Sequence, residues 1–149
     1  GGWLQVAVQK VRSTQNEVKV IGVDILPVDN IPGSKTFIGD INDSSIDKKL
    51  LDFLGDYPDI ILSDMAANVI GHKQTDHLRT TQLIEIALDF TLKNLKKNGT
   101  FLVKTFKGGT ETKLLNIMKK KFNYVKNIKP LASRPESVES YTVCLDFKG

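Results

Sequence analysis

The stretch Asp59-Ile60-Ile61-Leu62-Ser63-Asp64-Met65-Ala66-Ala67-Asn68 decides the fold. An apolar run that ends in an acidic residue and opens into small residues is typical of a strand in an open α/β sheet, where ligands bind beyond the carboxyl ends of the strands. Asp64 is therefore a candidate site residue. The alternative is that its carboxylate only caps the following turn.

Other segments alternate in the same way between strand and helix patterns. Strands are expected at residues 18–23, 36–38, 60–64, 100–106, 124–128 and 140–147. Helical spacing of apolar residues predicts helices at 3–11, 46–54, 76–97 and from 110 to about 122, with Ser44 and Ser45 or Asp76 as N-caps. This alternation predicts an α/β fold with a mostly parallel sheet and helices on both faces.

Length and composition favour one enzyme-sized domain over residues 1–149. The chain has 149 residues, of which 40% are hydrophobic, and this suffices for one core. Its single cysteine, Cys144, excludes a disulfide framework within one chain. No apolar run approaches about 18 residues and no signal peptide is visible, so we expect a cytoplasmic protein without a membrane span. A net charge of +4 mildly favours a polyanionic partner.

Several short motifs follow one another along the whole chain. They are Gly1-Gly2-Trp3, Val23-Asp24-Ile25-Leu26-Pro27, Gly39-Asp40, Ser63-Asp64-Met65-Ala66, Gly99-Thr100-Phe101-Leu102-Val103-Lys104, and Lys129-Pro130 followed by Ser133-Arg134 and Glu139. In this order and spacing the chain resembles the FtsJ family of S-adenosylmethionine-dependent ribose 2′-O-methyltransferases. The resemblance implies a Rossmann-like methyltransferase fold with S-adenosyl-L-methionine as cofactor.

The cofactor would lie at the strand ends. Asp24 follows the glycine turn by about twenty residues, a spacing that suits a carboxylate binding ribose hydroxyls but would suit NAD equally well. The resemblance implies that Asp40 takes the adenine amine, that the backbone of Gly1 approaches the methionine moiety, and that Asp64 also borders the cofactor. Trp3 matches a cofactor-site position of the family, or is a core aromatic at a helix start.

The resemblance also implies the catalytic residues. Three members of the family's Lys-Asp-Lys-Glu tetrad correspond to Asp64, Lys104 and Glu139, and the chemistry requires no metal. Lys104 is the candidate base that accepts the hydroxyl proton, although two neighbouring carboxylates should raise its pKa. Desolvation and the sulfonium would oppose that shift. Alternatively, a protonated Lys104 only orients the hydroxyl oxygen.

In the family a strand precedes the glycine turn, and an N-terminal segment carries the first lysine of the tetrad. We therefore expect this chain to lack its native N-terminal segment, and with it the first strand of the sheet.

RNA contact is expected first at Arg134, in the loop before Glu139. Lysines 93, 96, 97 and 119–121 could contact phosphates, or could be solvated helix ends that complement the helix dipole. His72 and His77 could in principle bind a metal, but we expect them to be solvated.

The favoured substrate is a uridine of large-subunit ribosomal RNA. We expect the enzyme to be a monomer. One alternative is a transfer-RNA anticodon-loop ribose, and another is a non-catalytic cofactor-binding RNA module. A buried lysine between carboxylates argues against the second alternative, because a pure binder does not need it.

Overall fold

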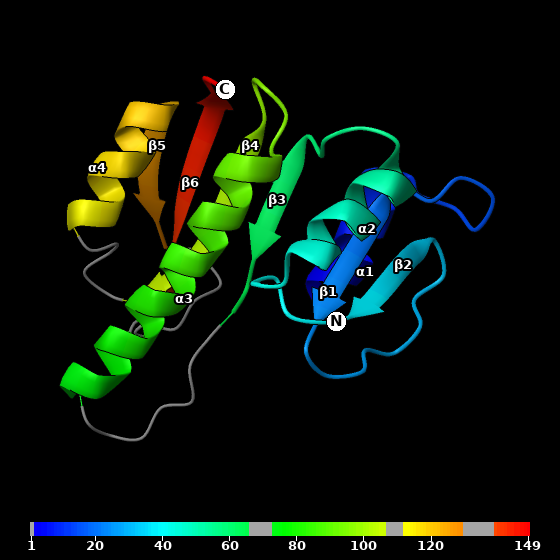
Figure 1. Cartoon of the computed structure of the whole chain (residues 1–149), viewed down its shortest axis with the longest axis horizontal. Coiled ribbons are helices and arrows are strands. Elements are labelled where there is room, and N and C mark those ends of the chain that lie inside the picture. The colour runs from blue at the N-terminus through cyan, green and yellow to red at the C-terminus, as the bar shows by residue number, and fades with distance from the viewer. Residues whose placement is uncertain (1, 66–72, 107–111, 130–138) are drawn as a thin grey trace. The chain divides into compact units, whose positions relative to one another are not determined.

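The computed structural model describes residues 2–65, 73–106, 112–129 and 139–149 (Figure 1). These form an α/β protein whose elements divide between two compact units, Gly1–Asp56 and Tyr57–Gly149. No described helix is both long enough and apolar enough to cross a membrane.

The first unit is built on a two-stranded parallel sheet. Strands β1 (Val20–Asp24) and β2 (Ser34–Ile38) pair in register, with Gly22 beside Thr36 and Asp24 beside Ile38. Helices α1 (Gly2–Lys10) and α2 (Ser44–Leu54) complete the unit.

The two helices cover opposite faces of this small sheet. A Cβ added at Gly22 would lie 3.4 Å from Leu4 Cδ1, so α1 packs closely on the face of Gly22. The next strand position presents Phe37 to Phe53 of α2, with ring centroids 6.2 Å apart in an edge arrangement. Successive strand residues point to opposite faces, which places α1 and α2 on different sides.

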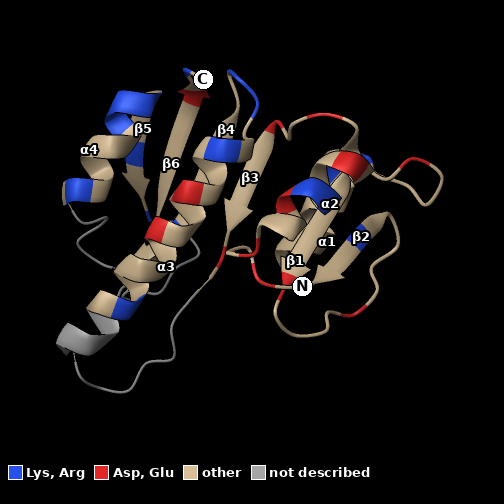
Figure 2. Ribbon diagram, viewed as in Figure 1, with Lys and Arg blue, Asp and Glu red and all other residues tan. Residues whose placement is uncertain are grey.

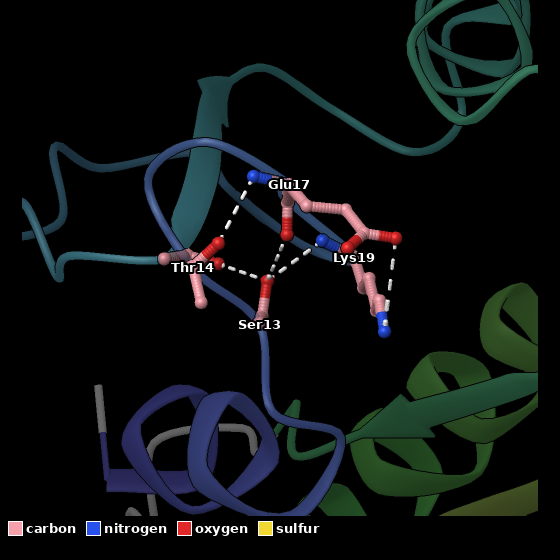
Figure 3. A network of polar contacts seen from close by, with 5 residues as sticks. Ser13, Thr14, Glu17 and Lys19 are labelled. Atoms are coloured by element: carbon pink, nitrogen blue, oxygen red, sulfur yellow. Dashed lines mark hydrogen bonds and ion pairs between the residues drawn. The ribbon is translucent and has the colours of Figure 1, made fainter.

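Ser13 fixes the turn between α1 and β1 (Figure 3). Its buried Oγ donates to the Gly33 carbonyl at 2.5 Å and accepts from the Lys19 backbone N–H at 2.7 Å. Gly33 has a φ of +87°, and a Cβ there would lie 2.7 Å from the Ser13 carbonyl oxygen. The close approach that brings β2 beside β1 therefore requires glycine at this position.

The second unit contains a mixed sheet in the order β3-β4-β6-β5. Its strands are β3 (Ile60–Ser63), β4 (Thr100–Phe106), β5 (Phe122–Ile128) and β6 (Glu139–Phe147). The β3–β4 pairing is parallel, whereas β6 pairs antiparallel with both β4 and β5. Our expectation of a mostly parallel sheet is therefore wrong for the described strands of this unit.

Both helices of the second unit, α3 (Lys73–Asn94) and α4 (Thr112–Lys121), lie on one face of its sheet (Figure 1). They share a core with the strands, consisting of Ile84, Ala87, Leu88, Leu95, Phe101, Val103, Leu114, Met118, Phe122, Cys144 and Phe147. The expectation of helices on both faces thus does not hold for the described helices here.

Several predicted element ends were also wrong. Asp43, and not Ser44 or Ser45, caps α2, because its side chain accepts a hydrogen bond from the Ser45 backbone N–H. Helix α3 begins at Lys73, so Asp76 lies inside the helix and cannot be its N-cap. Phe122 begins β5 instead of ending α4.

Candidate active site

Lys104 and Asp64 form an ion pair at the carboxyl ends of β4 and β3. The parallel register sets Ser63 beside Val103. The residues that follow them, Asp64 and Lys104, are therefore also neighbours. Lys104 Nζ lies 3.2 Å from Asp64 Oδ1, and the two side chains are 18% and 49% exposed. The acidic residue after the apolar run therefore faces the strand lysine.

Lys104 lies on the sheet face that α3 and α4 do not cover. Its strand neighbours Val103 and Thr105 are buried at 2% and 1% exposure, and strand alternation places Lys104 on the other face. An ammonium group largely removed from water is costly unless it is paired. The Asp64 carboxylate provides that partner while its own greater exposure leaves it open to solvent or a ligand.

Glu139 is the first residue of β6. The backbone register sets it opposite Phe106, while Tyr141 stands opposite Lys104. Glu139 is therefore a diagonal neighbour of Lys104 across the strand pair. Its side chain lies outside the described part of the structure, so its role toward Lys104 stays a prediction.

Tyr141 is a neighbour of Lys104 that our sequence analysis did not name. It occupies the cross-strand position directly opposite Lys104 and is half-buried. Cross-strand partners have Cβ atoms about 4.5–5.5 Å apart, close enough to shape the surroundings of the lysine. The sequence holds no signal for this pairing, because the register of β6 against β4 depends on the fold.

In the first unit, Asp24 and Asp40 lie at one edge of the small sheet. Asp24 ends β1, and Asp40 follows β2 by two residues. The Gly39 N–H donates to the Asp24 carbonyl at 2.8 Å and ties the two strand ends together. Asp24 Oδ1 accepts from the Leu26 N–H at 3.1 Å, and Asp40 Oδ1 accepts from the Asn42 N–H at 2.9 Å.

Exposed apolar residues lie next to these two carboxylates in the chain. Ile25, Leu26 and Ile38 are 69%, 66% and 64% exposed. Exposed apolar residues of this size beside convergent polar groups are typical of ligand-binding surfaces. The combination suits a nucleoside, because carboxylates accept hydrogen bonds from hydroxyl or amino groups and apolar side chains cover a base.

Trp3 lies in the first turn of α1 and is half-buried. A Cβ added at Gly22 would lie 3.4 Å from Leu4 Cδ1, so this turn packs beside the middle of β1. The position agrees with either interpretation of Trp3, as a cofactor neighbour or as a packing residue.

Other predicted site residues lie outside the described residues, namely Gly1, Arg134 and His72. The side chain of His77 also lies outside them. Within the part of the chain that the structure describes, no three His, Cys, Asp or Glu residues are grouped so that they could hold a metal ion.

The sequence profile of FtsJ-like methyltransferases matches residues 1–147. Ribosomal RNA large subunit methyltransferase E of Brucella ovis and that of Brucella suis are each 51% identical over 149 residues, covering 100% of this chain and 62% of the relative. The chain thus spans less than two thirds of the length of these curated relatives. A crystal structure of a protein described as a ribosomal RNA methyltransferase from Plasmodium falciparum superimposes with a TM-score of 0.83 at 34% identity, covering 100% of this chain and 82% of that one.

Proposed function

Since the chain belongs to the FtsJ-like methyltransferase family, we propose that it catalyses methyl transfer from S-adenosyl-L-methionine to a ribose 2′-hydroxyl of RNA. The observation that carries the proposal is the ion pair of Lys104 with Asp64, 3.2 Å apart at the carboxyl ends of two parallel strands. The proposed substrate is large-subunit ribosomal RNA, because the Brucella relatives are named for that RNA. A uridine is proposed as the target nucleotide from the family resemblance.

The residues of the first unit fit the cofactor. Asp24 would accept hydrogen bonds from the ribose hydroxyls and Asp40 from the adenine amine, with Ile25, Leu26 and Ile38 against the base. Each carboxylate accepts a hydrogen bond through Oδ1 from the backbone two residues further on. The backbone of Gly1 is proposed to approach the methionine part, and Trp3 to border the cofactor.

The cofactor supplies a methyl group activated by a sulfonium. In the transfer the carbon–sulfur bond breaks, an oxygen–carbon bond forms, and the hydroxyl proton must leave. The protein chiefly has to align the 2′-oxygen and remove that proton. Lys104 is proposed to act on the oxygen, either as the proton acceptor or as a positively charged group that orients it.

Asp64 and Glu139 are proposed to position Lys104 from two sides. Asp64 Oδ1 already binds the ammonium, and the greater exposure of its side chain would let it contact the substrate ribose as well. The role proposed for Glu139 is based on the register of β6, which makes Glu139 a diagonal neighbour of Lys104.

Arg134 is proposed to contact RNA phosphates near this site. We further propose a monomeric, cytoplasmic enzyme with one Rossmann-like domain.

The test is methyl transfer from labelled cofactor to large-subunit ribosomal RNA, followed by alkaline hydrolysis, which spares the linkage next to a 2′-O-methyl group. Lys104→Ala should lower the single-turnover rate by roughly 10²–10⁴, the usual scale for a positioned acid-base group. The control is Lys48→Ala, which removes one positive charge from an exposed position on α2 and should leave the rate unchanged.

Lys104→Arg distinguishes the two roles of the lysine. Arginine keeps the charge but does not give up its proton, so it should not restore the rate if Lys104 accepts a proton. A rate close to that of the parent would limit Lys104 to orienting the hydroxyl. Methyl groups found only on bases, or transfer to transfer RNA in place of ribosomal RNA, would contradict the proposed function.

A further inference from the structure

Seven exposed lysines gather at one end of the second unit, and we call this surface the basic end. They come from the last turns of two helices and from two loops, and are Lys93, Lys96, Lys97, Lys119, Lys120, Lys121 and Lys148. Figure 2 shows them in blue at the ends of α3 and α4, on the turn before β4 and beside the C-terminus.

Backbone contacts hold the three segments of the basic end together. The Lys148 N–H donates to the Lys121 carbonyl at 2.8 Å, which joins the end of β6 to the end of α4. The Asn98 N–H donates to the Phe147 carbonyl at 2.8 Å and ties in the turn before β4. Lysines far apart in the sequence therefore share one surface.

The basic end and the ion pair of Lys104 and Asp64 lie at opposite ends of strand β4. Lys97 precedes β4, whereas Lys104 is near the carboxyl end of that strand. At about 3.3 Å per strand residue, the five steps from Gly99 to Lys104 span roughly 16 Å. A single nucleotide bound at Lys104 could not also reach the basic end.

Carboxylates neutralise only part of this charge. Asp59 Oδ1 lies 3.9 Å from Lys96 Nζ and partly neutralises that lysine. Asp146, two residues before Lys148, instead accepts a hydrogen bond from Asn123 Nδ2 at 2.6 Å. Lysines in the last turns of α3 and α4 complement the helix dipoles. This explanation does not extend to Lys97 and Lys148, which lie outside both helices.

We propose that the basic end is a second RNA-binding surface, which contacts the phosphate backbone of the substrate RNA at a distance from the methylated nucleotide. The proposal rests on the proposed function, since it takes the same RNA as its ligand. A group of exposed lysines drawn from several segments binds phosphates without sequence preference. It would thereby favour long, folded RNA over a short fragment.

The test compares two triple variants that remove the same charge. One is Lys97→Gln/Lys121→Gln/Lys148→Gln, which takes one lysine from each segment of the basic end. The control is Lys10→Gln/Lys48→Gln/Lys49→Gln, whose lysines are exposed on α1 and α2. Each is titrated, across a salt series, with large-subunit ribosomal RNA and with the shortest fragment of it that the parent protein methylates.

We expect the basic-end variant to bind the long RNA roughly tenfold or more weakly at low salt, with the slope of log affinity against log salt reduced by about 2. Its affinity for the short fragment, and its single-turnover rate on it, should match those of the control. Lys97→Arg/Lys121→Arg/Lys148→Arg should restore binding to the long RNA, and this variant separates lost charge from lost folding.

An unchanged slope on long RNA would overturn the proposal, as would an equal loss of affinity for the short fragment. Failure of the parent protein to methylate either RNA would instead contradict the proposed function, because that result does not depend on the basic end.

Discussion

At the scale of single residues, the candidate site depends on how strands β3 and β4 pair. Asp64 is the residue after β3, and Lys104 is inside β4. The parallel register brings them together at 3.2 Å, whereas a shift of one residue would turn Lys104 toward the helix-covered core. The function proposed for Lys104 therefore rests on backbone pairing as much as on the lysine itself.

Asp24 gives the residue-scale prediction for the cofactor. Asp24→Ala should weaken binding of S-adenosylmethionine by about 1.5–3 kcal/mol, because a carboxylate that accepts hydrogen bonds from the ribose is lost. Calorimetric titration measures the change. Asp52→Ala, which removes an exposed carboxylate from α2, should leave the affinity unchanged. Parent-like affinity in folded Asp24→Ala protein would place the cofactor elsewhere.

At the scale of elements, the N-cap of α2 was predicted at the wrong one of three adjacent polar residues. Asp43, Ser44 and Ser45 are all good capping residues, and we expected the cap at the two serines. In the structure Asp43 has extended backbone angles, with φ −83° and ψ 117°, and its Oδ1 accepts from the Ser45 N–H at 3.0 Å. Gly55 then ends the helix in the left-handed conformation.

The cap makes the stability of α2 depend on pH. The hydrogen bond from the Ser45 backbone, followed by that from its side chain, lowers the pKa of Asp43 below 3.8. A carboxylate with a lowered folded pKa stabilises the fold above its unfolded pKa, and this contribution is lost as the pH falls through the folded value.

We therefore expect the thermal midpoint of the parent to fall, relative to that of Asp43→Asn, when the pH is lowered from about 5 to about 2. Asparagine caps a helix nearly as well but does not titrate. Asp43→Ala should lower the midpoint at pH 7 as well, because it removes the cap outright. Parallel pH curves for the parent and Asp43→Asn would show that the cap carries no pH-dependent stability.

At the scale of the whole molecule, Cys144 reports on the core of residues 57–149. The residue is fully buried in the cluster that α3, α4 and the strands share, and its thiol is free. Burial raises the pKa of Cys144 to about 12, so little thiolate exists near neutral pH. A thiol reagent should therefore react only when this unit opens.

Leu88→Ala should speed labelling of Cys144 by roughly tenfold or more, because truncating a buried leucine costs about 2–5 kcal/mol of stability. Leu88 is 1% exposed, whereas Leu78 on the same helix is 59% exposed. Leu78→Ala is thus the matched control and should leave the labelling rate near that of the parent. Equal rates in both variants would mean that the reagent reaches Cys144 through local opening.

The sequence by itself determined the α/β alternation, the strands that carry Asp24, Asp64 and Lys104, and the family resemblance, because apolar periodicity and short motifs are local properties. Tertiary structure alone decided that β6 runs antiparallel between β4 and β5 and that Tyr141 stands opposite Lys104. It also gathered the lysines of the basic end. Strand order and register arise from contacts between segments far apart in the chain, so no local pattern encodes them.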